Sequence, residues 1–167
     1  MFLNKKKVIF LTSIFSLLFF ITFTQVKSQE LKVVDGDTIH LNDNKIRFTG
    51  IDTPELKQTC IKDGVKNLCG RTAKLLLVNK IGNKHIKCIS EGKDQYKRTL
   101  AECFVNDESL SSYLVRNGYA FAYRKYSKKF IPDEDYAKAN KIGMWSINFD
   151  YPWDYRKKRC SVIKPLI

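Results

Sequence analysis

The chain has 167 residues, which is long enough for one domain of ordinary size and leaves no room for a second large one. It carries 30 lysine and arginine side chains against 17 aspartates and glutamates, a formal net charge of +13. This excess favours a polyanionic partner, of which nucleic acid is the commonest, although a cationic exported protein kept soluble by its charge fits the same composition.

Residues 1–28 have the layout of a signal peptide. A basic stretch that ends at Lys7 precedes an uncharged run over 8–24, and cleavage is predicted after Ser28. The apolar run is long for a cleaved signal, so an uncleaved membrane anchor is the alternative. Without this segment, which holds four lysines and no acids, 26 basic and 17 acidic side chains remain, a net charge of +9. Either alternative predicts export, to the periplasm or as a secreted protein.

Residues 31–41 and 45–51 predict the two strands of a β-hairpin, joined by a polar turn at 42–44. Because side chains alternate along a strand, the second strand directs Ile46 to the core face and Arg47 to the polar face. An arginine on the polar face of a strand is free to contact a ligand.

The hairpin predicts that two aspartates approach each other at its end. A simple register about the turn pairs Asp37 with Thr49, three residues short of Asp52. A bend at Gly50 is then needed to bring the two carboxylates together. Pro54 removes a ladder donor, so we expect the chain to leave the sheet near Asp52.

The rest of the chain predicts three helices and two more strands. They are a helix over 70–82 closed by Gly82, strands over 84–90 and 98–105, a helix capped by Asp107 that ends near Gly118, and a last helix over 132–145. Residues 151–167 form a basic, aromatic tail without a clear period. Short strands followed by helices predict an α+β protein, with a small barrel capped by helices as its natural compact form.

Four charged side chains at the end of the hairpin suit phosphodiester hydrolysis. Asp37 and Asp52 supply hard oxygen ligands beside free carbonyls, a mixed set that favours Ca²⁺. Glu55 follows the stiff Pro54 and would lie beside a metal-bound water, while Arg47 is suited to bidentate contact with a phosphate. Each of these residues alone is more often a solvated loop or surface charge, so the hypothesis depends on the joint pattern.

Four segments together resemble the staphylococcal nuclease family: DGDTI at 35–39, IRFTGIDTPE at 46–55, DQYKR at 94–98 and LVRNGYAFAYRKY at 114–126. The resemblance runs from about residue 31 to Trp145. It implies an OB-fold, a five-stranded β-barrel with about three helices, and a Ca²⁺-dependent nuclease that hydrolyses DNA and RNA and leaves 3′-phosphates. It also implies a nuclease domain over 29–150.

The resemblance assigns roles residue by residue. It makes Asp37, Asp52 and the carbonyl of Thr53 the metal ligands, and Asp35 an acid close to the metal. It makes Glu55 the catalytic glutamate, and Arg47 and Arg98 the two arginines that contact the transferring phosphate.

The substrate-stacking residues depart from the family pattern. Of the family's two nucleotide-stacking tyrosines, one matches Tyr126, but the other aligns with Arg124, and Tyr123 is the candidate substitute. The aromatic residues of the tail are interpreted as packing over the barrel rather than as a second binding site. We expect a monomer that binds DNA and RNA without sequence preference and without a protein partner.

All five cysteines follow residue 28, and no CxxC motif is present, so disulfides are favoured over zinc. A hairpin about the loop at 90–98 places Cys88 opposite Cys103. A bridge between Cys60 and Cys69 would restrain the chain that leaves Glu55. We predict these two pairs with Cys160 free; reduced core residues at 88 and 103 are the alternative. The predicted disulfides are therefore Cys60–Cys69 and Cys88–Cys103.

Two other classes of protein compete with a nuclease. A non-catalytic nucleic-acid-binding OB domain would not require the acids and arginines all at once. A cationic surface or adhesion protein would need no acidic cluster. The complete set of charged residues therefore favours the enzyme.

Overall fold

The computed structural model describes residues 29–163, and the predicted signal peptide or anchor over 1–28 lies outside the described residues. Its elements in chain order are β1 (Leu31–Val33), β2 (Thr38–Leu41), β3 (Asn44–Phe48), β4 (Ile51–Asp52), β5 (Thr59–Lys62), β6 (Val65–Leu68), α2 (Cys69–Ile81), β7 (Lys87–Lys93), β8 (Thr99–Val105), β9 (Glu108–Ser109), α3 (Leu110–Arg116), β10 (Phe121–Ala122), α4 (Ile131–Ala139), the 3-10 helix η1 (Gly143–Ser146) and α5 (Pro152–Ile163).

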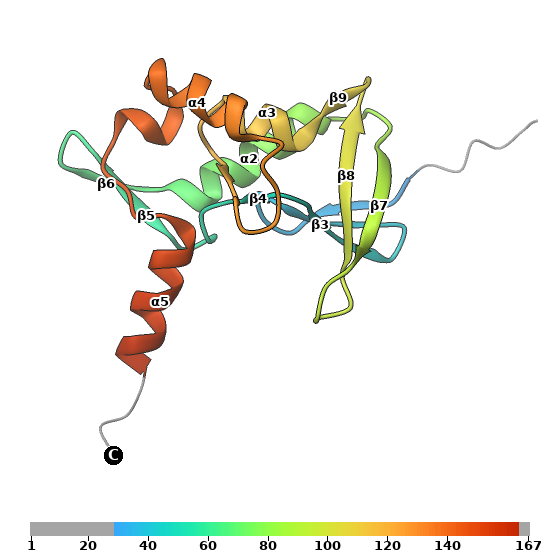
Figure 1. Cartoon of the computed structure of the whole chain (residues 1–167), viewed down its shortest axis with the longest axis horizontal. Coiled ribbons are helices and arrows are strands. Elements are labelled where there is room, and N and C mark those ends of the chain that lie inside the picture. The colour runs from blue at the N-terminus through green and yellow to red at the C-terminus, as the bar shows by residue number, and fades with distance from the viewer. Residues whose placement is uncertain (1–28, 164–167) are drawn as a thin grey trace, which may run out of the picture.

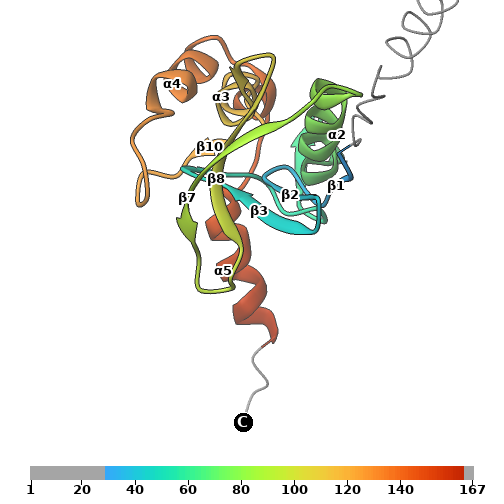
Figure 2. The ribbon, with the colours of Figure 1, turned by 90° about the vertical axis from the view of Figure 1, so that its right-hand side faces the viewer.

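The fold is mixed α+β, as predicted. One sheet has the strand order β1-β2-β3-β8-β7, with β9 paired to β8, and the short pairs β4–β10 and β5–β6 lie outside it. Helices α2, α3 and α4 gather on one side of the molecule, and α5 extends away from them on the other (Figures 1 and 2). Within residues 29–163, no helix combines the length and apolar character that crossing a bilayer requires.

The first hairpin is one residue out of the predicted register. Leu41 pairs with Asn44 and Thr38 with Arg47, because Asn42 and Asp43 alone form the turn with positive φ angles of 48° and 65°. A two-residue turn of this hand matches the twist of the strands, and asparagine and aspartate tolerate the conformation. Asp37 is therefore level with Phe48, whose N–H donates to the Asp37 carbonyl at 2.8 Å, and not with Thr49.

The predicted bend at Gly50 is confirmed. Strand β3 ends at Phe48, β4 begins at Ile51, and Gly50 between them has a φ of +74°. A Cβ at this position would lie 2.8 Å from the Cβ of Ser127, so both the backbone conformation and the close packing require glycine.

The buried apolar face of the sheet packs against the helices. Along β3 the buried Ile46 and Phe48 alternate with the half-buried Arg47, and β8 adds the buried Ala101 and Cys103 to the core. The main cluster also takes Leu77 from α2 and Leu114 from α3. This packing fixes the outward direction of Arg47.

Helix boundaries differ from the prediction at one cap and in the last helix. The helix predicted over 132–145 is divided into α4 and η1, because Lys141 between them and Gly143 at the start of η1 have positive φ angles of 51° and 59°.

Gly82 ends α2 and Gly118 follows the end of α3, as predicted. Asp107 does not cap α3. It belongs to the turn before β9, and the Ser109 hydroxyl instead accepts the N–H of Ser112. A serine next to the first helical residue satisfies the same unpaired donor that aspartate would have reached.

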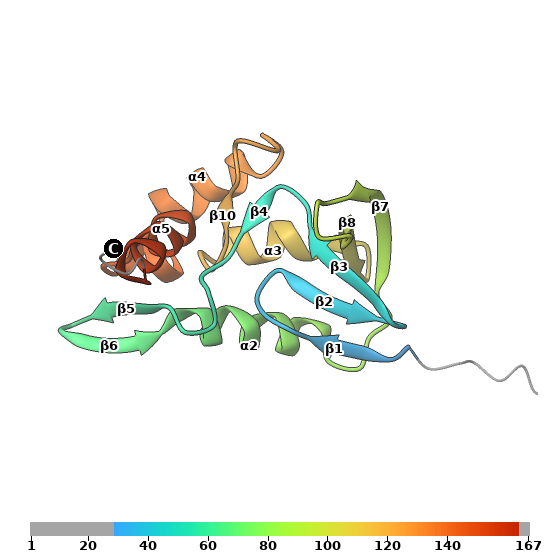
Figure 3. The same ribbon diagram turned by 90° about the horizontal axis from the view of Figure 1, so that it is seen from below.

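Two segments for which the sequence predicted no secondary structure form strands and a helix. Residues 59–68 form the hairpin β5–β6, and much of the predicted tail forms α5. A second buried cluster of Cys60, Cys69, Phe121 and Met144 packs against aromatic rings at 145–153. The tail aromatics therefore pack on the body of the protein. Figure 3 shows α5 beside β5.

The two predicted cysteine pairs, Cys60–Cys69 and Cys88–Cys103, lie at disulfide distance, and Cys160 is exposed and free. Cys88 and Cys103 are direct cross-strand partners in β7 and β8, as the hairpin register predicts. The first pair ties hairpin β5–β6 to the start of α2.

Peptide mapping without reduction should recover the two linked pairs and a free thiol at Cys160. Replacing both Cys88 and Cys103 by alanine should lower the free energy of unfolding by about 2–4 kcal/mol, because the bridge limits the unfolded chain. Denaturant unfolding measures this change. Cys160→Ala is the matched control and should leave stability unchanged, and a linkage of Cys160 to any other cysteine would contradict the pairing.

Candidate active site

The two candidate metal carboxylates are buried and share a hydrogen-bond network. Asp37 directly precedes β2, Asp52 ends β4, and each is exposed by 1% or less. One oxygen of Asp37 accepts both the backbone N–H and the hydroxyl of Thr53 at 2.8 Å. The guanidinium of Arg47 donates to Asp37 and also to Asp52, the latter at 2.9 Å. The bend at Gly50 thus brings both acids to one arginine.

Gly36 allows the turn before β2 to approach Thr53. A Cβ at Gly36 would lie 2.8 Å from the Thr53 hydroxyl oxygen, and the other Thr53 side-chain atoms are almost as close. A larger residue would separate the turn from Thr53. Glycine in the DGDT segment therefore brings the Asp37 carboxylate into reach of the segment that holds Asp52.

Asp35 lies beside this network. Its carboxylate accepts the N–H of Asp37 at 3.1 Å. Burial raises the pKa of Asp35, and the positive charges of Arg47 and Arg98 act in the opposite direction. Asp35 thus stabilises the turn through its hydrogen bond to the Asp37 backbone, and its carboxylate interacts electrostatically with both candidate phosphate arginines.

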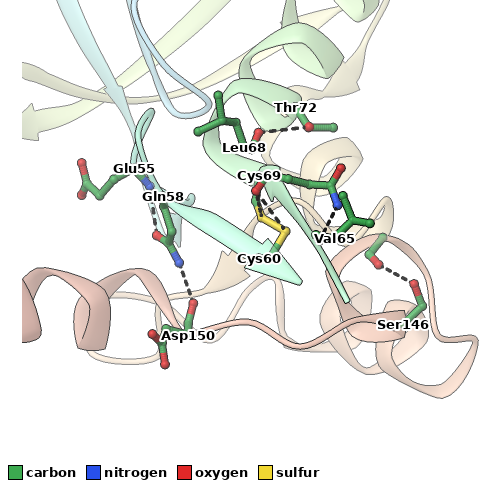
Figure 4. The surroundings of a disulfide bond; sticks show 11 residues. Glu55, Gln58, Cys60, Val65, Leu68, Cys69, Thr72, Ser146 and Asp150 are labelled. Atoms are coloured by element: carbon green, nitrogen blue, oxygen red, sulfur yellow. Dashed lines mark hydrogen bonds between the residues drawn. A yellow bond between two sulfur atoms is a disulfide. The ribbon is translucent and has the colours of Figure 1, made fainter. Parts of the chain in front are cut away.

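The backbone of Glu55 is fixed while its side chain stays accessible. The buried Gln58 side chain accepts the Glu55 N–H at 3.1 Å and donates to the carbonyl of Asp150 at 2.7 Å (Figure 4). At the start of α2, a Cβ on Gly70 would lie 1.8 Å from the Glu55 carbonyl oxygen. The Glu55 side chain itself is 37% exposed. A carboxylate held in this way can act on a water molecule.

One candidate phosphate arginine lies on β3, and the other directly precedes β8, the strand that pairs with β3 in parallel. Strand β3 pairs with β8 so that Arg47 is level with Leu100. Arg98 lies two positions before Leu100, just outside the strand. Its side chain is 30% exposed and donates to Asp94 at 2.7 Å. Both arginines are close enough to Asp35 for their charges to oppose the rise in its pKa.

The three candidate substrate-contacting residues follow β10. The Tyr123 and Tyr126 rings meet edge to face, with centroids 4.9 Å apart, and Tyr126 is largely exposed. The Arg124 guanidinium bonds to the buried Glu134 carboxylate at 2.6 Å. That hydrogen bond, against a smaller effect of burial, raises the pKa of Arg124. Arg124 is thus directed toward α4, and the tyrosines supply the aromatic surface.

Sequence reasoning missed Arg156, which lies in the predicted tail. On α5 its guanidinium donates to Asp52 at 2.6 and 3.2 Å and to Glu55 at 2.9 Å. Partial burial would lower the pKa of Arg156, but the hydrogen bonds to Asp52 and Glu55 outweigh it and hold this pKa well above its ordinary value. One side chain thereby joins the candidate metal ligand to the candidate general base.

Sequence reasoning also missed Trp153. Its ring stacks on Tyr123, with centroids 5.6 Å apart and planes 6° from parallel, and on Tyr151 at 4.7 Å. Two signals in the sequence could have revealed this helix, namely Pro152 at its first position and Asp154 in its first turn. Helix α5 therefore connects the aromatic surface to the acidic site.

The donor chemistry of the site fits a hard divalent cation. Asp37 and Asp52 supply buried carboxylate oxygens, and the buried Thr53, which directly follows Asp52 in the chain, has a main-chain carbonyl that could serve as a further oxygen ligand. Within residues 29–163, no group of three or more histidine, cysteine, aspartate or glutamate side chains is arranged to hold a metal. An ion here would depend on two carboxylates together with carbonyl and water oxygens, a mixture typical of Ca²⁺.

Residues 45–147 match the family model described as staphylococcal nuclease homologue. An uncharacterized endonuclease of Haemophilus influenzae is 30% identical over 125 residues, which cover 71% of this chain and 65% of that protein. A probable staphylococcal-like nuclease of Oryza sativa subsp. japonica is 34% identical over 116 residues, 68% of this chain and 28% of the rice protein. An SPbeta prophage-derived endonuclease of Bacillus subtilis is 32% identical over 129 residues, 70% of this chain and 43% of that one. The chain thus spans less than two thirds of each of these relatives.

Proposed function

The chain belongs to the staphylococcal nuclease family, and we propose that it is an exported, Ca²⁺-dependent nuclease that hydrolyses DNA and RNA to leave 3′-phosphate ends. One observation carries the proposal: Arg47 contacts both buried aspartates, and Asp52 is joined through Arg156 to Glu55. Acids for a cation, a carboxylate for water and an arginine for phosphate are the parts that phosphodiester hydrolysis requires.

Each side chain has a distinct role in this proposal. Asp37, Asp52 and the Thr53 carbonyl would hold Ca²⁺, which when bound supplies positive charge for a phosphate oxygen and a water molecule. Glu55 takes a proton from the attacking water, or orients it. Arg47 and Arg98 neutralise the oxygens of the pentacoordinate phosphorus, where negative charge is greatest.

The surroundings of the site support binding without sequence preference. The net positive charge attracts the phosphate backbone, an interaction that weakens steeply as salt rises. Tyr123 and Tyr126 offer aromatic surface on which any base can stack. We propose a monomer whose substrates are single-stranded DNA, duplex DNA and RNA.

Two features bear on export and on the extent of the domain. The cysteine pairs at disulfide distance support an oxidising compartment, where such bonds persist. Because Arg156 and Trp153 contact the site, we propose that the nuclease unit begins near residue 29 and extends beyond residue 150 to include α5.

A digestion series tests the function. Plasmid, single-stranded DNA and RNA are incubated with the protein in Ca²⁺ or chelator, and the products are offered to a polymerase before and after phosphatase treatment. Cleavage in Ca²⁺, with 3′ extension only after phosphatase, is the expected result. A shifted band on a gel without cleavage would instead indicate a non-catalytic nucleic-acid-binding domain.

Removing the metal should abolish cleavage, and Ca²⁺ alone should restore it. Oxygen-only ligation predicts no requirement for Zn²⁺. Mg²⁺ should support little turnover, because its small octahedral shell fits the mixed donor set poorly. Initial rates after chelation and addition of each ion separately measure this preference. Full activity in chelator would contradict the proposed cation site.

A further inference from the structure

Arg156 uses the same oxygen atoms that the proposed cation would need. Both oxygens of Asp52 accept from its guanidinium, at 2.6 and 3.2 Å, in a bidentate arrangement. Its Nη1 also donates to Glu55 at 2.9 Å. Asp52 has no exposed surface, so solvent cannot compensate its charge from outside. The arginine therefore supplies positive charge to a buried carboxylate that requires it.

The guanidinium and a cation cannot occupy this position together. A Ca²⁺ ion approaches its carboxylate oxygens to 2.3–2.6 Å. A bidentate arginine already lies along the same lone pairs of Asp52, and two positive charges at that separation repel each other. A cation that binds Asp52 must therefore displace Arg156 from at least one of its oxygens.

Arg47 does not replace Arg156 in this role. Arg47 lies on β3, is 19% exposed, and bridges Asp37 and Asp52 from within the sheet. Arg156 approaches from α5, is 40% exposed, and is the one side chain of residues 29–163 that joins Asp52 to Glu55. In the described part of the chain, Arg156 is thus the one residue that contacts both the candidate ligand and the candidate base and has room to move into solvent.

The helix has contacts that do not depend on Arg156. Trp153 stacks on Tyr123, the Tyr155 hydroxyl donates to the Lys57 carbonyl at 3.2 Å, and Gln58 donates to the Asp150 carbonyl just before α5. These contacts hold the start of the helix against the body. The Arg156 side chain can therefore leave the carboxylates while its backbone remains beside them.

We propose that Arg156 is a built-in competitor for the cation site, which neutralises Asp52 and Glu55 when no ion is bound and thereby sets the Ca²⁺ concentration that the enzyme requires. The proposal rests on the proposed Ca²⁺ site. It makes Arg156 a residue that determines cation affinity. While bound to Glu55, it also occupies the Oε1 oxygen of that carboxylate, so this oxygen is not available to a water molecule until Arg156 moves away.

Calorimetric Ca²⁺ titration of the full folded protein tests the proposal. Arg156→Gln should bind Ca²⁺ about 5- to 20-fold more tightly than the wild type, because a competing charge has been removed. Arg159→Gln is the matched control. Arg159 lies on the same helix, is exposed, and makes no hydrogen bond or ion pair within the described part of the chain. The control should stay within about twofold of the wild type, since exposed charges are screened.

A second variant and a second readout separate competition from a structural tie. Arg156→Lys retains the positive charge but loses the planar guanidinium fork, so its Ca²⁺ affinity should lie between that of the wild type and that of Arg156→Gln. In chelator Arg156→Gln should melt below the wild type, and saturating Ca²⁺ should remove most of that difference. A lower melting temperature with unchanged or weaker Ca²⁺ affinity would mean that Arg156 only anchors α5, and would overturn the proposal.

The same titrations distinguish failure of this proposal from failure of the proposed function. If the wild type and Arg156→Gln bind Ca²⁺ with equal affinity and both cleave plasmid in a Ca²⁺-dependent way, Arg156 is not a competitor for the cation. The proposed nuclease function would then still hold. Absence of Ca²⁺ binding in all variants overturns the competitor role together with the calcium site.

Discussion

Glu55→Gln is expected to lower kcat by about 10²-fold or more while DNA binding survives. The amide cannot accept the proton of the attacking water, but it retains an oxygen that can still accept from Arg156. The backbone of residue 55 stays fixed by Gln58, so the rest of the site should be preserved. Single-turnover cleavage in Ca²⁺ measures the chemical step, and fluorescence anisotropy with labelled DNA measures affinity.

Glu91→Gln is the matched control for this result. Glu91 is an exposed residue of β7, and the same loss of one negative charge there should leave both cleavage and affinity unchanged. An unchanged cleavage rate in Glu55→Gln would remove this carboxylate from the mechanism. A loss confined to DNA affinity would assign it to binding instead.

Arg47→Lys and Arg98→Lys should each impair cleavage by about 10²-fold, and affinity for DNA by much less. Lysine keeps the positive charge but loses the planar fork that contacts two phosphate oxygens. The fork is most useful when charge on those oxygens is greatest, so kcat should fall more than KM rises. Steady-state kinetics on a defined oligonucleotide separate the two parameters.

The two arginine variants should differ in stability. Arg47 joins two buried aspartates, so Arg47→Lys should also melt at a lower temperature in chelator. Arg98 instead pairs with the partly buried Asp94 and lies over the exposed Tyr96 ring. Arg71→Lys, an exposed change on α2, is the control for lysine substitution itself. Equal losses in affinity alone would show that both arginines bind the ground state only.

The sequence predicted the parts of the fold that local rules determine. Gly82 ends α2, Gly50 bends the chain between β3 and β4, and Cys88 faces Cys103 because hairpin positions are fixed by counting across a loop. The first hairpin was one residue out of register, since a turn of two residues or of three fits the same polar segment. The register that the protein adopts differs from the predicted one in which residues face each other across the hairpin. Both aspartates nevertheless contact Arg47.

Long-range packing explains what the sequence did not predict. Helix α5 has no apolar stripe, because its contacts are an arginine on buried acids and aromatic rings near its start. Periodicity therefore could not identify it. The same is true of β5–β6, where Ile61 and Val65 are exposed and the pairing depends on the turn at Gly64. The sequence made Asp37, Asp52, Glu55 and Arg47 candidates, and the family resemblance added Arg98. Arg156 could be found only from the packing of α5 against Asp52 and Glu55.

The parallel pairing of β3 with β8 has a consequence for the order in which the molecule folds. Ile46 pairs with Thr99, so the long segment between them must close into a loop, at a cost in entropy, before the strands can pair. Contacts so distant in sequence form slowly. A chain that emerges from its N-terminus would hold Asp37 and Arg47 long before Arg98 becomes available, and Arg156 would arrive last. In the proposed nuclease, the two arginines for the phosphate therefore come together only after β8 has been made, so the site assembles after residue 98 and not with the first hairpin.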